Sequence, residues 1–206
     1  TRAENNRISV VPVVPNRGLI VDRNGVVLAT NYSAYTLEIT PSKVDELEAT
    51  IDALAGLVEV STRDRRRFRR LAEEGKSFES LPIRTKLSDE EVARFMAQRF
   101  RFPGVDVKAR LFRNYPLGET GSHLLGYIGR INQAEKKLME DWPDEQLANY
   151  KGTEYIGKLG LEQSYEAELH GQTGFERVET SAGGRAVRRL SSHAPTPGHA
   201  LMLSID

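Results

Sequence analysis

The stretch that decides the fold is Arg17-Gly18-Leu19-Ile20-Val21-Asp22-Arg23-Asn24-Gly25, which continues through Val26-Val27-Leu28-Ala29-Thr30-Asn31. Two short apolar runs, residues 19–21 and 26–28, flank Asn24-Gly25. Asn and Gly both tolerate the positive φ that a two-residue hairpin turn requires. We therefore predict a β-hairpin whose type I′ turn is centred on Asn24-Gly25.

A second glycine-punctuated stretch lies far along the chain. It reads Gly157-Lys158-Leu159-Gly160-Leu161-Glu162-Gln163-Ser164-Tyr165-Glu166, and Leu169, Gly171 and Gly174 follow it. Leu161, Tyr165 and Leu169 recur every four residues, which predicts one amphipathic helix ending near Gly171. Glu162 and Glu166 could be catalytic carboxylates. Because charged residues on a helix are usually solvated, we expect them on an exposed face instead.

The segment between these stretches changes character at Pro41 and again at Pro103-Gly104. Before Pro41 the chain favours strands, including an alternating run at residues 35–39. Residues 42–104 have helical spacing, with a strand expected at 78–87. Three pairs predict capped helix starts: Ser42 with Asp45, Ser61 with Asp64, and Ser88 with Glu91.

Strand patterns resume from Val105 to the end of the chain. We expect strands at residues 105–111, after Ser122-His123, from Phe175, through Val187 and Leu190, and at 201–205, with a turn at Gly183-Gly184. A short helix is expected after Asn132, and residues 141–153 are expected to form a loop. The fold class is therefore α+β, with a β-rich frame (residues 1–41 and 105–206) and an inserted small helical lobe (residues 42–104).

Composition excludes several classes of function. The 206 residues carry 29 basic and 29 acidic side chains, so no net field attracts nucleic acid or an anionic membrane. With no cysteine, the chain has neither disulfides nor thiolate metal sites. No apolar run is long enough to cross a bilayer and no signal peptide is visible, so we expect any membrane anchor to lie outside this chain.

Candidate chemical groups do not assemble into an active site. His123, His170, His193 and His199 lack metal-ligand spacing, and we expect His123 to be a buried or hydrogen-bonded structural residue. The basic run Arg63-Arg70 could contact phosphates, but a solvated helix face, which could also face an acidic partner, is the commoner outcome. The chain contains no Ser-x-x-Lys and no Lys-Thr-Gly. We expect no catalytic residue, cofactor or metal.

Both stretches, together with residues 115–129, resemble the non-catalytic N-terminal part of class B penicillin-binding proteins. The matching residues are Arg17, Gly18, Asp22, Arg23, Asn24, Gly25, Asn31, Tyr115, Pro116, His123, Gly126, Gly157, Gly160, Leu161, Glu162, Tyr165, Glu166, Gly171, Gly174, Gly184 and Arg185. Tyr115-Pro116 and Ser122-His123-x-x-Gly126-Tyr127 are more similar to the elongation type, penicillin-binding protein 2, than to the division type. The resemblance covers most of the chain outside the helical lobe.

The resemblance implies an elongated pedestal frame carrying a head lobe, on the periplasmic side of the bacterial inner membrane. It implies a full-length parent that crosslinks peptidoglycan through an active serine, as a D,D-transpeptidase. The implied partners are a SEDS-type glycan polymerase and a rod-shape scaffold protein. A periplasmic glycan- or peptide-binding module is the alternative from another functional class.

Overall fold

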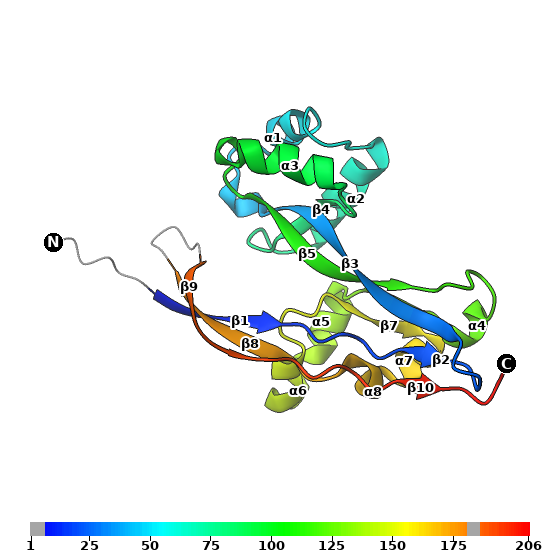
Figure 1. Cartoon of the computed structure of the whole chain (residues 1–206). Helices are drawn as coiled ribbons and strands as arrows, with labels where there is room; N and C mark the ends of the chain where they lie inside the picture. The colour runs from blue at the N-terminus through cyan, green and yellow to red at the C-terminus, as the bar shows by residue number, and fades with distance from the viewer. Residues whose placement is uncertain (1–6, 181–185) are drawn as a thin grey trace. The chain divides into compact units, whose positions relative to one another are not determined.

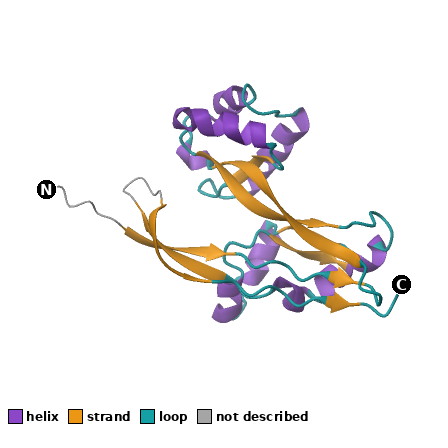
Figure 2. Ribbon diagram, in the orientation of Figure 1, coloured by secondary structure: helices purple, strands orange, loops and turns teal. Residues whose placement is uncertain are grey.

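The chain folds into two compact units. The computed structural model describes residues 7–180 and 186–206, so the expected turn at Gly183-Gly184 lies outside the described residues. Residues 32–112 form one unit, and residues 1–31 and 113–206 form the other. The boundaries fall within the strands β3 (Val27–Ile39) and β5 (Val105–Asn114) rather than at Pro41 and Gly104. The α+β class is confirmed (Figures 1 and 2).

Three groups of strands build the first unit. The first is an antiparallel sheet of β1 (Arg7–Val13), β8 (Gly174–Thr180) and β9 (Ala186–His193). In the second, β2 (Ile20–Val21) pairs in parallel with β10 (Leu201–Met202) and antiparallel with the start of β3. The third is the antiparallel pair β6 (Tyr127–Arg130) and β7 (Tyr155–Leu159). Its helices are α4 (Ser122–Leu125), α5 (Gln133–Met139), α6 (Asp144–Asn149), α7 (Gly160–Ser164) and α8 (Glu166–His170).

Two apolar clusters hold these elements together. The first cluster packs β2, β3, α4 and α8 together through four buried side chains: Ile20, Ala29, Leu125 and Leu169. Ile131, Met139 and Tyr150 form the other around α5 and the residue after α6. Burying such side chains is the main favourable term in folding, so the short helices of this unit owe their stability to packing rather than to length.

The predicted hairpin forms, but its turn is of another type. The amide of Gly25 donates to the carbonyl of Asp22 at 3.1 Å, which makes Arg23 and Asn24 the central residues. Gly25 has φ +81°, whereas Asn24 is not among the described positive-φ residues, as a type I′ turn would require. The prediction of a type I′ turn is therefore wrong. Asp22 decides the turn, because its Oδ1 accepts the amides of Asn24 and Val26, each at 2.8 Å.

The second unit packs three helices against strands (Figure 2). It contains the second half of β3, β4 (Leu81–Arg84), the first eight residues of β5, the helices α1 (Leu47–Leu54), α2 (Thr62–Glu74) and α3 (Asp89–Gln98), and 3-10 turns at Pro41–Lys43 and Arg99–Arg101. Both β4 and β5 pair with β3. Phe68 of α2 and Phe95 of α3 are fully buried in a core shared with Leu37, Ile51 and Ile83.

Two of the three predicted capping boxes are confirmed. Ser61 and Ser88 each accept the amide three residues later, and Asp64 and Glu91 return the bond. The Ser42–Asp45 box does not form, because Pro41 opens a 3-10 turn and Val44 is extended, so α1 begins only at Leu47. Asn132 caps the expected short helix α5 in the same way.

Several expected element boundaries are also wrong. Residues 141–153 contain α6 rather than only a loop. Pro143 is the N-cap of this helix, and Asp144 and Glu145 place acidic side chains in its first turn, where the helix dipole favours them. The strand expected at 78–87 shrinks to β4, and that expected at 201–205 shrinks to β10. In β3 the expected alternation fails at Glu38, which is 1 % exposed because Arg110 binds its carboxylate through two hydrogen bonds of 2.8 Å.

Candidate functional site

The two predicted stretches meet at one buried carboxylate, Glu162. It lies in α7, whose first residue is Gly160 with φ +61°, and its side chain is 0 % exposed. The prediction that Glu162 is solvated is therefore wrong. A buried carboxylate is costly unless it is paired and hydrogen-bonded. The surrounding residues supply those partners.

Arg17 binds two acids and one carbonyl at this point. Its Nε donates to Glu162 Oε2 at 2.7 Å, and its Nη2 donates to the Glu162 main-chain oxygen at 2.7 Å. Its Nη1 lies 2.6 Å from Glu166 Oε2. Burial lowers the pKa of Arg17, but the charges of Glu166 and Glu162 outweigh it and raise that pKa overall. The hairpin motif is thereby joined to α7 and α8.

Arg113 closes the other side of Glu162. Its Nε donates to Glu162 Oε1 at 2.7 Å, and Tyr115 donates its hydroxyl to the same oxygen at 3.2 Å. Asn31 links the two arginines, because its Oδ1 accepts from Arg113 and its Nδ2 donates to the Arg17 carbonyl. Burial, followed by the charge of Glu162, raises the pKa of Tyr115 to about 12.

Glu166 extends the network toward α6. Its Oε1 accepts the Tyr150 hydroxyl and its Oε2 accepts the Gly157 amide, both at 3.2 Å. The prediction that Glu166 is solvated is also wrong. Burial raises its pKa and outweighs the opposite effect of Arg17. Burial, then the charge of Glu166, raises the pKa of Tyr150.

His170 is the last residue of α8 and is buried against this network. Its ring stacks on Tyr150 with centroids 4.0 Å apart. Its Nδ1 lies 3.1 Å from the Gly171 carbonyl and its Nε2 lies 2.9 Å from Thr153 Oγ1. Because a carbonyl only accepts, Nδ1 carries the hydrogen and neutral Nε2 accepts from Thr153. Burial lowers the pKa of His170.

The helix predicted from Leu161 to Leu169 is divided at Tyr165. That residue ends α7 and precedes α8 with φ −110° and ψ 27°, and its side chain is 43 % exposed. Leu169 is fully buried and Leu161 packs against the same cluster, so only these two share the expected face. The break turns Glu162 and Glu166 toward Arg17.

Two hairpin residues and most of the predicted glycines have structural roles. Asp22 holds the turn, and Arg23 donates to the Ser204 carbonyl at 2.6 Å and pairs with Asp206. A side chain on Gly157 would overlap the main chain of Glu162. Main chains also pass close to the following glycines: Gly18, Gly126, Gly160, Gly171 and Gly174. Gly184 and Arg185 lie outside the described residues.

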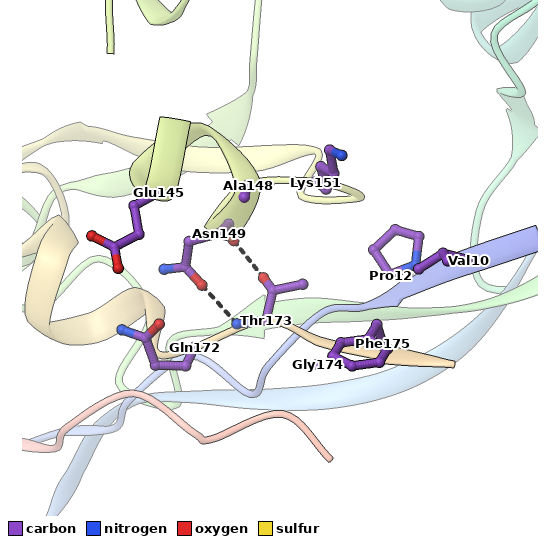
Figure 3. A pocket seen from close by; sticks show the side chains of 10 residues that line it. All are labelled: Val10, Pro12, Glu145, Ala148, Asn149, Lys151, Gln172, Thr173, Gly174 and Phe175. Carbon is purple, nitrogen blue, oxygen red and sulfur yellow. Dashed lines mark hydrogen bonds between the residues drawn. The ribbon is translucent and has the colours of Figure 1, made fainter. Parts of the chain in front are cut away.

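His123 was predicted to be buried or hydrogen-bonded, and its exposure contradicts the first of these alternatives. It lines a cavity of about 350 Å³ with Tyr115, Glu119 and Tyr127, while the neighbouring Pro116 is exposed. A second cavity, of about 370 Å³, lies beside β1 and α6 (Figure 3). There the Asn149 amide is already engaged, because it donates to the Gly171 carbonyl and accepts the Thr173 amide.

The geometry indicates a structural centre rather than a reaction centre. Glu162 is closed off from solvent, so it cannot exchange a proton with a substrate. Among the described residues, no group of three or more His, Asp or Glu side chains could hold a metal ion. The network instead joins the start of β3, the end of β5 and the helices α7 and α8 within one unit.

The likeness to known proteins extends over nearly the whole chain. Residues 12–203 match the penicillin-binding protein dimerisation domain. The chain belongs to this family. Peptidoglycan D,D-transpeptidase MrdA of Escherichia coli K12 is 43 % identical over 206 residues, which are all of this chain and 32 % of that protein. MrdA of Acinetobacter baumannii is 38 % identical over the same length, 30 % of that protein.

This chain spans about a third of the length of these curated relatives. Stage V sporulation protein D of Bacillus subtilis is 31 % identical over 198 residues, or 95 % of this chain and 26 % of that protein. Among solved structures, the fold matches a chain from the complex between penicillin-binding protein PBP2 and MreC of Helicobacter pylori. The TM-score is 0.72 at 21 % identity, covering 96 % of this chain and 36 % of that chain.

Sequence reasoning missed the residues that complete the network. The sequence did not mark four members of the network as parts of one site: Arg113, Tyr150, Thr153 and His170. Arg113 binds Glu162, Tyr150 binds Glu166, and Thr153 binds His170. The available signal was the pair of glutamates one helical turn apart, because buried acids need basic partners elsewhere in the chain. Sequence separations of up to 145 residues hid those partners.

Proposed function

We propose that this dimerisation domain is the non-catalytic pedestal of an elongation-type peptidoglycan D,D-transpeptidase. The observation that carries the proposal is the 43 % identity to MrdA across every residue of the chain. Identity to the sporulation protein is lower, at 31 %, which favours the elongation type. In the full-length parent, an active serine outside this chain attacks the carbonyl of the penultimate D-alanine of one stem peptide and releases the last residue as an amine. An amine of another stem peptide then takes the acyl group and frees the serine.

The buried network supports a positioning role for the pedestal. Two arginines and two glutamates tie strands and helices together at distances of 2.6–2.7 Å, and none of the four side chains is more than 15 % exposed. Breaking a buried pair is strongly destabilising, so this centre resists deformation. A stiff support keeps a neighbouring catalytic domain at a fixed place, which the crosslinking of two anchored substrates requires.

The proposal includes two partners and a location. The Helicobacter pylori relative was solved with MreC, which supports a rod-shape scaffold protein as a partner of this pedestal. A SEDS-type glycan polymerase is proposed from the family resemblance. The pedestal would lie on the periplasmic side of the inner membrane, held by an anchor outside this chain. No described helix is both long enough and apolar enough to span a bilayer.

A chimera tests the proposal. The matching third of Escherichia coli MrdA is replaced by this chain, and the fusion is expressed as the only MrdA in the cell. We expect rod-shaped cells, because the pedestal would present the catalytic domain and the partner surfaces correctly. A chimera that reaches the membrane and binds labelled penicillin, but leaves the cells round, would contradict the proposal.

A binding measurement tests the scaffold partner separately. The purified chain is titrated with the periplasmic part of MreC from a species whose MrdA it resembles, and with an unrelated periplasmic protein as control. We expect saturable binding to MreC alone. If the chimera gives rod-shaped cells but the chain shows no detectable binding to MreC, the pedestal function stands and MreC is excluded as its partner.

A further inference from the structure

The helix α2 carries six arginines, and only three of them are engaged within the unit. Arg65 pairs with Asp52 at 2.6 Å, Arg67 with Asp64 at 3.1 Å, and Arg69 binds Glu48 through two hydrogen bonds of 3.0 and 2.8 Å. Two of these acids belong to α1. These three arginines therefore attach the helix to its own unit and its own cap.

The other three arginines form one outer stripe. Arg63, Arg66 and Arg70 are exposed, and within residues 7–180 and 186–206 no hydrogen bond or ion pair of their side chains is found. Spacings of three and four residues place them on one side of a helix that advances about 100° per residue. The buried Phe68 lies on the opposite side. We call these three residues the outer arginine stripe.

The charge order of α2 works against the helix itself. Arg63 and Arg66 lie in its first two turns, near the positive end of the helix dipole, while Glu73 and Glu74 close it at the negative end. Each such placement is unfavourable for the helix, most of all at a low ionic strength. Like charges three and four residues apart add further repulsion. Helix stability therefore does not explain why this stripe is basic.

We propose that the outer arginine stripe docks an acidic helical segment of a partner protein. Its three guanidinium groups follow one helix face over about 10 Å, at 1.5 Å per residue. Carboxylates with the same three-and-four spacing on a second helix can meet them, and arginine binds carboxylates in a bidentate manner. Exposed Glu73 and Glu74 continue the face beyond Arg70, so its sign reverses within one turn.

This reversal decides between classes of partner. A nucleic acid or an anionic lipid surface presents negative charge continuously and would meet Glu73 and Glu74 with repulsion. A helical segment can place a basic residue at that point and match the reversal. The inference does not depend on the proposed transpeptidase parent, because it rests only on α2 and its neighbours.

A designed peptide tests the stripe. The probe is an alanine-based helical peptide with three glutamates spaced four and three residues apart and one lysine a turn beyond. The control probe has glutamine in place of each glutamate. Binding to the whole chain is followed by calorimetry at low and high ionic strength. We expect only the glutamate peptide to bind, and added salt to weaken it.

Two triple variants with equal charge locate the binding face. The outer variant combines Arg63→Gln, Arg66→Gln and Arg70→Gln. It should bind the peptide about tenfold more weakly, because three exposed ion pairs are lost. The inner variant combines Arg65→Gln, Arg67→Gln and Arg69→Gln, and it should leave peptide binding nearly unchanged. Thermal melts accompany both variants. The outer variant should melt at the same temperature as the parent chain or higher, whereas the inner variant should melt lower.

Three results would overturn the inference. The first is equal binding of both peptides, and the second is equal binding to the parent chain and the outer variant. The third is stronger, arginine-dependent binding to phosphatidylglycerol vesicles or duplex DNA than to the glutamate peptide. A markedly lower melting temperature of the outer variant would show that the stripe stabilises the fold, and would also count against docking.

Discussion

At the scale of single residues, Glu162 shows how charge can organise an interior. Its carboxylate is fully buried, yet both oxygens are engaged by Arg17, Arg113 and Tyr115. The desolvation of such a group is repaid only when its geometry is good and its bonding complete. The value of Glu162 to the fold therefore depends on keeping its negative charge.

We predict that Glu162→Gln destabilises the chain by about 3–5 kcal/mol, the usual cost of removing one partner from a buried ion pair. The change preserves shape but leaves Arg17 and Arg113 facing a neutral amide. Urea denaturation measures the loss. Glu176→Gln is the control, because Glu176 pairs with the exposed Arg189 and should cost about 0–1 kcal/mol. Equal small losses in both variants would contradict the central role of Glu162.

Gly25 gives a second residue-scale prediction. Its φ of +81° penalises a β-branched residue, although a side chain there would meet no atom within 4 Å. Gly25→Val should therefore cost about 1–3 kcal/mol through backbone strain alone. Gly25→Asn should cost less, because Asn tolerates positive φ. Thermal melts compare the two variants, and equal negligible shifts would exclude strain at this position.

His170 makes stability depend on pH. Burial lowers its folded-state pKa below the ordinary 6.5, so the unfolded chain takes up the proton first as the pH falls. The stability contributed by neutral His170 is full above about pH 6.5 and is lost as the pH falls toward the folded-state value. The raised pKa of Glu166 acts oppositely, because its folded form binds a proton more readily than the unfolded form.

We predict that His170→Phe isolates the histidine contribution. The variant keeps a ring stacked on Tyr150 but loses the contacts with Thr153 and Gly171. The difference in unfolding free energy between the parent chain and this variant should shrink as the pH falls below about 6.5. Denaturation at a series of pH values measures it. A difference that stays constant across this range would contradict a lowered pKa.

At the scale of elements, short-range chemistry decided some boundaries and long-range contacts decided others. The Ser61 and Ser88 capping boxes form as the sequence predicts, because all their bonds lie within four residues. Ser42 and Asp45 have the same residue types and spacing as Ser61 and Asp64, but they form no capping box because Pro41 begins a separate 3-10 turn. The break at Tyr165 has no such local signal. It accompanies the contacts of Glu162 and Glu166 with Arg17.

Two serines test the capping argument. We predict that Ser61→Ala destabilises the chain by about 0.5–2 kcal/mol, because the Asp64 amide and one turn of α2 lose their cap. Ser42→Ala is the matched control and should change stability by less than about 0.5 kcal/mol. Chemical denaturation distinguishes them. A larger loss at position 42 than at position 61 would reverse the assignment of the caps.

At the scale of the whole molecule, the family and the chemistry fit together. The chain belongs to the penicillin-binding protein dimerisation domain and covers about a third of its curated relatives. Its sequence lacks the Ser-x-x-Lys and Lys-Thr-Gly motifs that β-lactam-trapping serine enzymes use. Among the described residues, the side chains of Glu162 and Glu166 bond only to arginine, tyrosine and a main-chain amide, and to no serine.

We predict that the 206-residue chain is not acylated by labelled penicillin. Without a serine activated by a neighbouring lysine, no nucleophile is available to open the β-lactam ring. Intact-mass spectrometry measures the adduct, with a full-length MrdA as the positive control. A stoichiometric adduct on this chain would contradict the prediction.

The sequence alone determined those features whose causes are local. It predicted the hairpin near Gly25, the caps at Ser61 and Ser88, the α+β class and the family resemblance, because turns, caps and periodicity depend on neighbouring residues. It also marked Arg17, Asn31, Tyr115 and Glu162 as members of shared motifs. It could not say that these residues touch one another.

Only the tertiary structure decided how the marked residues are used. The sequence pattern predicts solvated acids at Glu162 and Glu166, whereas in the structure Arg17 pairs with both and Arg113 pairs with Glu162. Arg17 lies 145 positions before Glu162 in the sequence. Their burial is a free-energy balance between desolvation and pairing, and pairing depends on which segments meet in space. A single sequence does not specify directly which distant segments come into contact. The buried network around Glu162 could therefore be identified only from the tertiary structure.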